Sequence, residues 1–482
     1  MIDLRPVAYV IGRILIVLAI LMLAPAIVDW RAGLENGHDF LASSVLTGVA
    51  GAALTLSTGN ALGQALDTRQ AYLLTAGIWF LVPFFGALPF YIGAPGLSLN
   101  QAYFEAVSGI TTTGATVIYG LEDLPAGMNL WRGMLNWLGG LGIAFIAMIF
   151  LPLMRVGGMQ FFRTEGFDTF GKALPRATDI AMQLLVVYLL LTLACIATYA
   201  AIGMTTLDAV VGGFATIATG GFFPADISFS KYPGAGEYAG ALFMILAAMP
   251  YIRFVQLLNG SPAPLLRDAQ LRSYLVWLIC VVLTMTAWRV LVSGSDVEPT
   301  FREALFNLTS IMTGTGFFSG SFGGWGGFVM LVAFIVGLIG GCSGSSSGAL
   351  TVFRVQIALK IMGREIRRIG NPRAVDLIKY DGKSIGEDVT KAVIMFVFGY
   401  ILIIGLLSTA MTLTGVDIVS ATFGVWQAMG NIGYGFGPMV ARTGTFVDFP
   451  PAAIAIMTLA MILGRLGLLA ILVVILPRFW RA

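Results

Sequence analysis

The sequence predicts an all-α polytopic membrane protein in which an N-terminal helix pair precedes four pseudo-repeated helix–pore loop–helix units around one pore. Of the 482 residues, 57% are hydrophobic and only 11% are charged, whereas a soluble domain averages about 25% charged residues. The apolar runs reach the roughly 20 residues of a transmembrane helix, about twice the length of a barrel strand. A short glycine-centred element also recurs four times, each time between two apolar stretches.

Composition excludes several classes of function. The net charge of +3 is small, and no basic groove with interleaved aromatic residues is present, so we expect no nucleic-acid partner. Cys195, Cys280 and Cys342 all lie inside apolar segments, which argues against a disulfide framework. The apolar run 11–27 is interpreted as a retained first helix, because no convincing cleavage site of small residues follows it.

The four glycine-centred copies read TTTGA, IATGG, TGTGF and GNIGY, at 111–115, 217–221, 313–317 and 430–434. Taking the second-to-last residue of each copy as the anchor gives one glycine per copy: Gly114, Gly220, Gly316 and Gly433. Four equivalent loops around one axis offer a dehydrated cation a ring of backbone carbonyls, which is how potassium filters are built. Glycine favours the backbone conformations that turn those carbonyls inward.

The predicted K⁺ ligands are mainly the backbone carbonyls of these loops, and K⁺ is the transported ion rather than a resident cofactor. These ligand residues are Thr111, Thr112, Thr113, Gly114, Ala218, Thr219, Gly220, Gly314, Thr315, Gly316, Asn431, Ile432 and Gly433. A threonine precedes the anchor in three copies, and its hydroxyl would add a ligand or hold the strand. The fourth copy differs, so we expect a pore that is only pseudo-symmetric. No organic cofactor is expected in this chain.

The chain divides into an N-terminal transmembrane helix pair and four repeats, with predicted bounds of 1–69, 70–177, 178–273, 274–388 and 389–482. The helix pair covers 7–28 and 42–66. Each repeat has an outer helix, a short pore helix, a loop and an inner helix. The first repeat has 71–93, 101–110, 111–117 and 131–154, the second 178–203, 206–216, 217–222 and 238–258, the third 274–292, 302–312, 313–318 and 325–360, and the fourth 389–413, 417–429, 430–435 and 449–476.

The short segments are predicted to be re-entrant. A segment such as 102–110 is too short to span a bilayer core about 30 Å thick and too apolar for a solvated loop. Bent backbone at membrane depth is tolerated only where protein covers it or where it lines a wet cavity. A short helix that dips into the membrane and returns as a filter strand satisfies this condition.

Charge asymmetry orients the chain. Basic residues gather in the connections after the first three repeats and at the C-terminus, for example Arg163, Arg267 and Arg368, whereas the opposite loops are lean and acidic. Because cytoplasmic loops carry the excess of Lys and Arg, we expect both termini in the cytoplasm and the four loops entering from outside. The acidic residues of the pore helices either attract cations at the outer mouth or are favoured by the helix dipole: Glu105, Asp208, Glu303 and Asp417.

A run of glycine and serine interrupts the third inner helix. It consists of Gly340, Gly341, Cys342, Ser343, Gly344, Ser345, Ser346, Ser347 and Gly348. Such residues form poor helix, and a broken helix in the membrane is expected where backbone lines a pathway. The alternative is a packing face of small residues between helices.

Arg465 is a second candidate gate residue. It lies in the middle of the fourth inner segment, between apolar residues, and an intramembrane charge is costly and usually functional. It could donate hydrogen bonds to the carbonyls of the 340–348 run and place a positive charge in the pore. The alternative is a structural ion pair or snorkelling to the interface.

These motifs together resemble the Trk/Ktr/HKT superfamily of K⁺ translocating subunits, and the bacterial TrkH type most closely. The similarity covers essentially the whole chain. It rests on the stretch SGITTTGAT at 108–116, GGMQFF at 157–162, GGCSGSSSG at 340–348 and GRL at 464–466. The additional N-terminal helix pair also favours the TrkH type over the shorter Ktr type.

The resemblance implies K⁺-selective uptake across the bacterial inner membrane. In the superfamily, Ser at the first-loop glycine accompanies Na⁺ permeation, and this chain has Gly114. The resemblance also implies that the 340–348 run is an intramembrane loop that blocks the cavity below the filter. Relatives commonly carry Glu two residues after the equivalent of Arg465, where this chain has Gly467, which leaves the arginine less neutralised.

The resemblance further implies a homodimer in the lipid bilayer, seated on a cytosolic ring of TrkA-type nucleotide-binding subunits. The chain itself has no phosphate-binding GxGxxG after a strand and no P-loop, so nucleotide control would come from the partner. The basic stretch 360–388 is either a docking surface for that ring or only a positive-inside anchor. The long continuation of the third inner helix towards Lys360 would couple the ring to the gate.

Three other functions compete with this interpretation. The sequence Gly341-Cys342-Ser343-Gly344 is similar to the motif of intramembrane serine proteases, but the only histidine is His38, in a predicted external loop, so no general base is available and we expect no enzyme. The K⁺-binding subunit of a P-type ATPase complex shares the four-block plan. A secondary transporter fits the broken helices but has inverted halves. Passive flow and coupling to H⁺ or Na⁺ both stay open.

Overall fold

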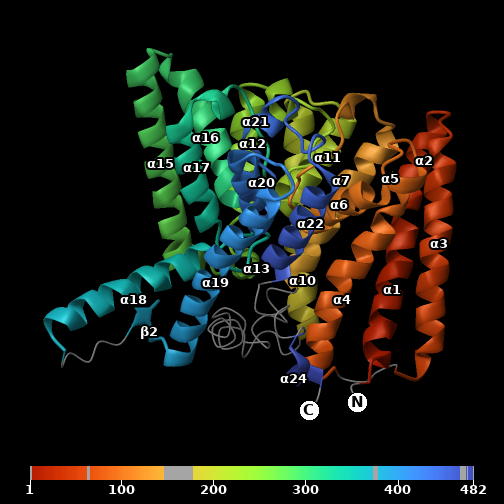
Figure 1. The fold of residues 1–482 in the computed structure, drawn as a ribbon, viewed down its shortest axis with the longest axis horizontal. Helices are drawn as coiled ribbons and strands as arrows, with labels where there is room; N and C mark the ends of the chain where they lie inside the picture. Colours follow the sequence, from red (N-terminus) through yellow and green to blue (C-terminus); the bar gives the residue numbers. More distant parts are fainter. Residues whose placement is uncertain are drawn as a thin grey trace.

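The computed structural model describes residues 3–61, 66–145, 177–372, 378–466, 474 and 476–480, and these are mostly helical (Figure 1). Among the described residues, six helices are long and apolar enough to cross a membrane, or seven if one strongly bent helix pair counts as a span. The predicted all-α membrane architecture is confirmed. The division into four repeats stays a prediction.

The N-terminal pair consists of α1 (Arg5–Leu21), which is followed by α2 (Leu23–Arg31), and of α3 (Asn36–Ser57). The two helices approach closely because Gly12 and Gly51 face each other. A Cβ atom on either glycine would lie 2.8 Å from the carbonyl oxygen of the other. Small residues at such crossings allow helices in membranes to pack backbone against backbone.

The other elements follow in chain order. The helices are α4 (Thr68–Gly86), α5 (Leu88–Ile92), α6 (Leu99–Ile110), α7 (Ala126–Phe145), α10 (Ala177–Ala201), α11 (Thr206–Ala218), α12 (Ala235–Ala247), α13 (Tyr251–Leu258), α14 (Ala263–Arg267), α15 (Ala269–Ser293), α16 (Val297–Thr313), α17 (Gly327–Ile339), α18 (Val352–Gly370), α19 (Glu387–Thr412), α20 (Ile418–Gly430), α21 (Pro438–Ala441), α22 (Pro451–Leu466) and α24 (Pro477–Trp480). Short 3₁₀ turns lie at Gly59–Ala61, Leu121–Asp123, Ser228–Lys231 and Phe322–Gly324.

Local sequence signals start the short helices α6, α11 and α20. Ser98 caps α6 by accepting a hydrogen bond from the backbone of Gln101, whose side chain accepts one from Ser98 N in return. Thr205 caps α11 through the backbone N–H of Asp208, and Asp417 caps α20 in the same way. These side chains satisfy N–H groups that a helix start leaves unpaired.

Two broken helices lie against each other. A single inner helix over 238–258 is wrong, because α12 and α13 meet at 89° at a break that contains Pro250. The predicted interruption of the third inner helix is present between α17 and α18. Tyr251 N donates to Gly344 O and Cys342 N donates to Ala248 O, both at 3.0 Å. Each break therefore provides partners for backbone groups that the other break frees.

The basic stretch 360–388 contains more regular structure than a solvated loop. Helix α18 projects sideways from the bundle and continues to Gly370 (Figure 1). After residues 373–377, which lie outside the described part, β1 (Lys379–Tyr380) pairs antiparallel with β2 (Lys383–Ser384). Tyr380 is buried against Phe353 of α18, with ring centroids 5.1 Å apart. The hairpin thus packs on the first half of the helix.

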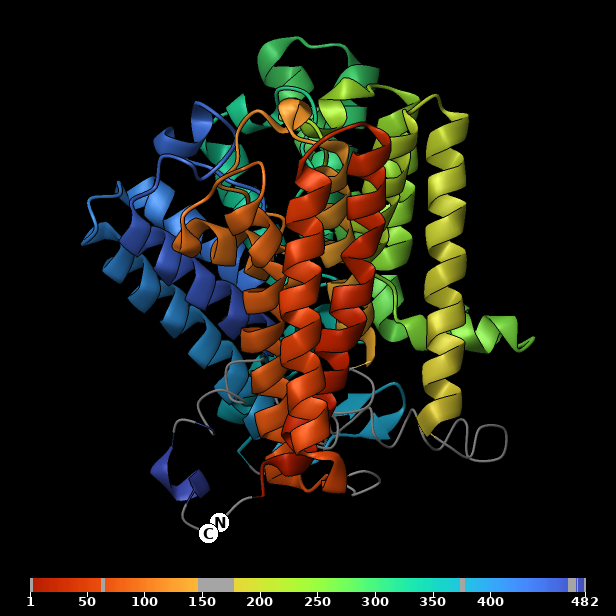
Figure 2. The ribbon, with the colours of Figure 1, turned by 90° about the vertical axis from the view of Figure 1, so that its right-hand side faces the viewer.

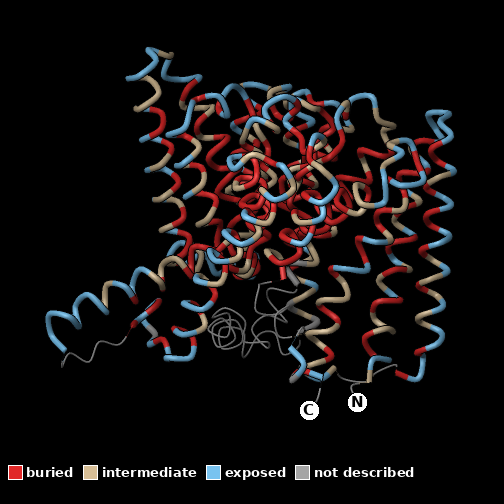
Figure 3. Tube along the Cα trace, in the orientation of Figure 1, coloured by how far each residue is buried: buried red, intermediate tan, exposed pale blue. Residues whose placement is uncertain are grey.

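Burial is concentrated where the short helices meet, and the long outer helices are exposed (Figure 3). Helix α10 stands on the outside of the bundle (Figure 2). Large apolar side chains on these helices are open, including Leu193 on α10, Leu291 on α15 and Phe398 on α19. Extended exposed apolar surface of this kind marks contact with a membrane.

Candidate ion pathway

The four loops share one backbone conformation. In each loop, one residue and the glycine two positions later both have positive φ angles. The pairs are Thr112 (53°) and Gly114 (80°), Thr219 (52°) and Gly221 (74°), Gly314 (74°) and Gly316 (83°), and Asn431 (50°) and Gly433 (77°). Residues other than glycine adopt this left-handed region rarely. Its presence at Thr112, Thr219 and Asn431 indicates that the surrounding structure holds the first, second and fourth loops firmly.

Hydrogen bonds repeat with the same spacing. The residue between the two positive-φ positions donates its N–H to the carbonyl five residues earlier, at the end of the short helix. The four bonds are Thr113 to Ser108 (2.8 Å), Gly220 to Ala215 (2.7 Å), Thr315 to Ser310 (2.9 Å) and Ile432 to Gln427 (2.8 Å). This is the pattern of a helix C-terminus closed by a left-handed residue.

The structure changes the register of the second loop. Gly220 is the anchor when the four copies are compared by sequence, but Gly221 has the backbone conformation of Gly114, Gly316 and Gly433. Thr219 therefore corresponds to Thr112 and not to Thr113. A threonine directly precedes the anchor in two loops only, at Thr113 and Thr315. The double glycine at 220–221 leaves the register open in the sequence, which explains the one-residue error.

Close contacts between the loops form a closed cycle. A Cβ atom on Gly114 would lie 2.3 Å from Gly220 O, and one on Gly221 would lie 2.1 Å from Thr315 O. The next two contacts complete the cycle: Gly316 to Ile432 O (2.0 Å) and Gly433 to Thr113 O (2.1 Å). Each anchor glycine thus lies against the carbonyl that precedes the anchor of the next loop. The four loops surround one axis in chain order.

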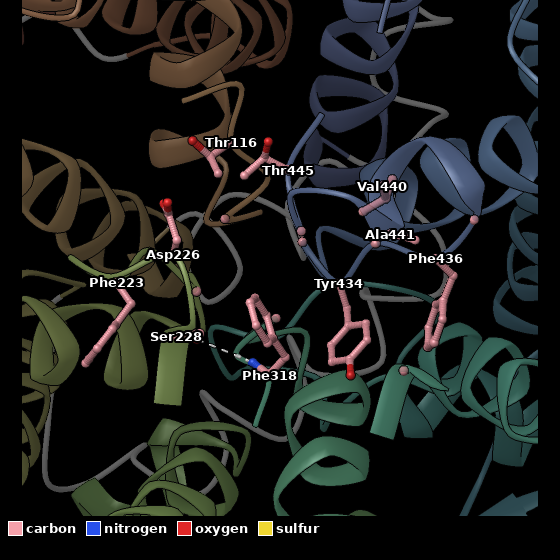
Figure 4. Close-up of a pocket in the computed structure, with 18 of the residues that line it drawn as sticks. Thr116, Phe223, Asp226, Ser228, Phe318, Tyr434, Phe436, Val440, Ala441 and Thr445 are labelled. Atoms are coloured by element: carbon pink, nitrogen blue, oxygen red, sulfur yellow. Dashed lines mark hydrogen bonds between the residues drawn. The ribbon is translucent and has the colours of Figure 1, made fainter. Parts of the chain in front are cut away.

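A cavity of about 800 Å³ opens onto all four anchor glycines. Its lining includes Gly114, Gly221, Gly316 and Gly433, together with residues of the strands that follow them. Figure 4 shows Thr116, Asp226, Ser228, Phe318, Tyr434, Phe436 and Thr445 around this space. The cavity is a vestibule on one side of the ring.

The acidic residues of the short helices do not line this vestibule. Glu105 is fully buried and forms an ion pair with Arg132 (2.9 Å). Asp208 pairs with Lys231 at 2.7 Å. Asp417 accepts hydrogen bonds from two backbone N–H groups of its own helix. These contacts favour structural roles over attraction of cations. Asp226, which the sequence analysis did not single out for the site, does line the cavity.

Side chains on the opposite face of the loops bond to one another. Thr111 and Thr113 share a hydroxyl–hydroxyl hydrogen bond of 2.8 Å, and Thr313 and Thr315 share the equivalent bond at 2.7 Å. Asn431 Nδ2 donates to Thr113 Oγ1 at 3.0 Å and so connects the fourth loop to the first. These hydrogen bonds favour the second of the two roles that the sequence suggested, in which the hydroxyls hold the strands.

The 340–348 run forms a compact loop under the ring, here called the Gly/Ser loop. Ser347 Oγ donates to Thr313 O (2.7 Å), and Ser346 Oγ donates to Ile217 O (3.1 Å). Tyr251 OH also lies within hydrogen-bond distance of both Ile217 O and Ser346 Oγ. The loop therefore contacts the carbonyls at the ends of two of the short helices. Its own ends meet, since a Cβ on Gly340 would lie 2.7 Å from Gly348 O.

Arg465 lies beside the Gly/Ser loop. Its Nη2 donates to Ser346 O at 2.5 Å, and its Nη1 would lie 3.2 Å from a Cβ on Gly348. The neighbouring Gly464 brings α22 onto α20, because a Cβ there would lie 2.1 Å from Met429 O. The Gly464-Arg465 pair thus positions the guanidinium under the fourth loop.

The remaining predicted residues lie partly within the Gly/Ser loop and partly outside the described residues. Cys342 is buried, its backbone N–H bonded to Ala248, and Ser343 shares a hydroxyl hydrogen bond with Thr351 at 2.7 Å. Ser345 Oγ donates to Cys342 O within the loop. The motif at 157–162, the basic residues 155–176 and Gly467 lie outside the described residues. Sequence reasoning missed Tyr251 and Gln270, whose Oε1 accepts from Ser343 N, because their helices are remote in sequence from the loop.

The fold and the ring of loops define the class of the protein, an integral helical membrane transport protein. Comparison with known proteins gives the family. The family model TrkH, described as "Cation transport protein", matches residues 36–481. The chain therefore belongs to the TrkH family. This is a transport family and not a family of enzymes, and its bacterial members are proteins of the inner membrane.

Individual relatives cover the whole chain. It is 36% identical over 480 residues to the Trk system potassium uptake protein TrkI of Halomonas elongata, with 99% of this chain and 97% of that protein covered. It is 32% identical over 486 residues to the Trk system potassium uptake protein TrkH of Escherichia coli K12, with 99% of each covered. The crystal structure of the potassium transporter TrkH from Vibrio parahaemolyticus is similar over 100% of both chains, with a TM-score of 0.91 and 29% identity.

Proposed function

We propose that this protein takes up K⁺ across the bacterial inner membrane through a selective filter made of the four loops. The observation that carries the proposal is the cycle of contacts in which each anchor glycine lies against a carbonyl of the next loop. The names of its relatives as potassium uptake proteins support the choice of ion. Of the competing functions, an intramembrane protease at Ser343 would require a general base beside the serine hydroxyl. That hydroxyl instead bonds to Thr351, and the family is one of transport proteins.

The filter would work by replacing water with fixed oxygens. The carbonyls before the four anchors belong to Thr113, Gly220, Thr315 and Ile432, and further oxygens come from the residues before them. The anchor glycines allow neighbouring strands to approach until their carbonyls surround one ion. Each of the predicted repeats 70–177, 178–273, 274–388 and 389–482 would supply one quarter of the ring.

The Gly/Ser loop would be the gate. It lies against carbonyls at the inner ends of the loops, through Ser346 and Ser347, and Arg465 bonds to its backbone. An ion leaving the filter would meet this loop and the positive charge beside it. Opening would require the loop to leave its contacts with Tyr251 and Arg465.

Control would come from a cytosolic nucleotide-binding ring of the TrkA type, on which two copies of this chain would be seated. Helix α18 continues directly from the Gly/Ser loop and carries the basic residues Arg364, Arg367 and Arg368. A movement of α18 on the ring would therefore reach the loop without an intervening element. In this arrangement both termini and α18 face the cytoplasm, and the vestibule faces outward.

The test is uptake of radioactive Rb⁺ into proteoliposomes, with and without the ring and its nucleotide. Uptake that K⁺ blocks and Na⁺ does not is the expected result. Uptake that Na⁺ and K⁺ inhibit equally, or its absence under all conditions with folded protein, would refute the filter.

A further inference from the structure

Two of the four short helices carry a polar side chain at the same place. Glu105 on α6 lies nine residues before Gly114, and Asn307 on α16 lies nine residues before Gly316. Both side chains are fully buried. Because the loops follow one another around the axis, the first and third loops lie opposite each other. The two side chains therefore occupy equivalent positions on opposite sides of the ring.

Both side chains hold the strand that leaves the anchor glycine. Glu105 Oε2 accepts a hydrogen bond from Val117 N at 3.1 Å, and Asn307 Oδ1 accepts one from Ser319 N at 3.2 Å. Val117 and Ser319 are each the third residue after the anchor. Glu105 also accepts from Thr116 Oγ1 at 2.9 Å. The same backbone N–H is thus fixed in both loops by the same helix position.

Each side chain is also connected to a neighbouring loop, Glu105 through Arg132 and Asn307 directly. Arg132 on α7 donates from Nε to Glu105 at 2.9 Å and from Nη1 to Phe223 O at 3.3 Å. Its guanidinium lies 4.2 Å from the centre of the Phe222 ring. Phe222 and Phe223 directly follow the second anchor, Gly221. Glu105 and Arg132 therefore connect the first loop to the second.

Asn307 connects the third loop to the fourth in an equivalent way. Tyr434 directly follows Gly433, and its hydroxyl donates to Asn307 Oδ1 at 3.1 Å. Asn307 Nδ2 donates to Ser319 O and to Glu303 O, both at 2.8 Å. The amide thus uses its oxygen and its nitrogen twice each, and no part of it is left to bind a ligand.

The second and fourth loops are held differently. The equivalent helix positions are glycines, Gly212 and Gly424. A Cβ on Gly212 would lie 3.1 Å from the ring of Phe223, so an aromatic side chain occupies the space next to the helix. Phe436 of the fourth loop packs on Phe423 and Tyr434, with ring centroids 5.1 and 5.0 Å apart. These loops rely on aromatic packing, and the first and third rely on hydrogen bonds.

We propose that Glu105 and Asn307 are positioning residues that set the K⁺ over Na⁺ preference of the filter, an inference that rests on the proposed function. In the cavity-size explanation of K⁺ over Na⁺ selectivity, the carbonyls keep their spacing when a smaller ion enters. Buried, fully satisfied polar networks are rigid and geometrically specific. The two networks join the loops in pairs, first with second and third with fourth. Loosening either one lets the ring contract around Na⁺.

The experiment compares two variants with one control. Glu105→Met with Arg132→Met removes the first network as a pair, which leaves no buried charge unpaired. Tyr434→Phe removes one hydroxyl from the second network. The control, Asp208→Met with Lys231→Met, removes an ion pair between the adjacent short helix α11 and the 3₁₀ turn Ser228–Lys231. In the described part of the chain, neither side chain forms a hydrogen bond with the three residues that follow an anchor glycine. Rb⁺ uptake is competed with K⁺ and with Na⁺, per amount of folded, monodisperse protein.

The measured quantity is the ratio of the Na⁺ to the K⁺ concentration that halves uptake. We expect this ratio to fall about fivefold in the double variant and by a smaller factor in Tyr434→Phe, because one neutral hydrogen bond contributes less than a charge-assisted network. The control keeps the wild-type ratio. An unchanged ratio in both test variants overturns the inference, as does an equal fall in the control. If the double variant does not fold, the ratio measured for Tyr434→Phe decides whether the inference holds. A wild-type protein without K⁺ preference refutes the proposed function instead.

Discussion

The close approach of the loops at Gly114 leads to the sharpest prediction. A Cβ atom there would lie 2.3 Å from Gly220 O, whereas real Cβ atoms keep at least 3.0 Å from other heavy atoms. Gly114→Ser must therefore widen the gap between the first and second loops by at least 0.7 Å (3.0 minus 2.3). The φ angle of 80° adds a strain of about 1–2 kcal/mol for a residue with a Cβ.

If that strain is relieved by movement of the carbonyls, the preference for K⁺ over Na⁺ falls by about tenfold, since each tenfold change corresponds to about 1.4 kcal/mol. The assay is Rb⁺ uptake competed by K⁺ and Na⁺. Gly260→Ser is the matched control, because Gly260 has a φ of 82° and nothing within 4 Å of its Cβ position. Wild-type selectivity in folded Gly114→Ser, or an equal loss in Gly260→Ser, would refute the reasoning.

Three further predictions follow from other contacts. Deletion of 341–347 should raise Rb⁺ flux in the absence of the ring, because the ends of the Gly/Ser loop already meet at Gly340 and Gly348; flux that stays dependent on the ring would count against the gate. Arg465→Ala should raise flux in the same direction but less, since it removes the bond to Ser346 O and leaves the loop; unchanged flux would exclude a gating role. Gly12→Leu should lower the midpoint of thermal unfolding by several degrees, because the contact of α1 with α3 is backbone against backbone; an unchanged midpoint in detergent would contradict that packing.

The sequence was sufficient for the helical membrane fold, the four loops and the interruption between α17 and α18. Hydropathy and the glycine-centred repeats carry these features, because they depend on local composition. The sequence does not show whether Gly220 or Gly221 is the anchor of the second loop, since both glycines satisfy the pattern. Only the φ angles distinguish them. The bend at Pro250 was missed because its freed backbone groups bond to a loop almost one hundred residues away.

The partners of Arg132 and Asn307 were not predictable either. Glu105 is recognisable in the sequence as an acidic residue of a pore helix, but its contacts depend on Arg132, which lies on the next helix. Nothing in the sequence pairs Asn307 with Tyr434, because they lie 127 residues apart. Contacts between segments that are remote in sequence define the site, and such contacts leave no periodic signal in one sequence.

In the proposed filter, one K⁺ binds on the axis between the carbonyls of Thr113, Gly220, Thr315 and Ile432. The most direct measurement is anomalous diffraction from crystals of the protein grown in Rb⁺, with a second set grown in Na⁺. We expect an anomalous peak on the axis between these four oxygens in Rb⁺, and we expect added K⁺ to abolish it. Anomalous density elsewhere in the protein, and none between the four oxygens, would contradict it.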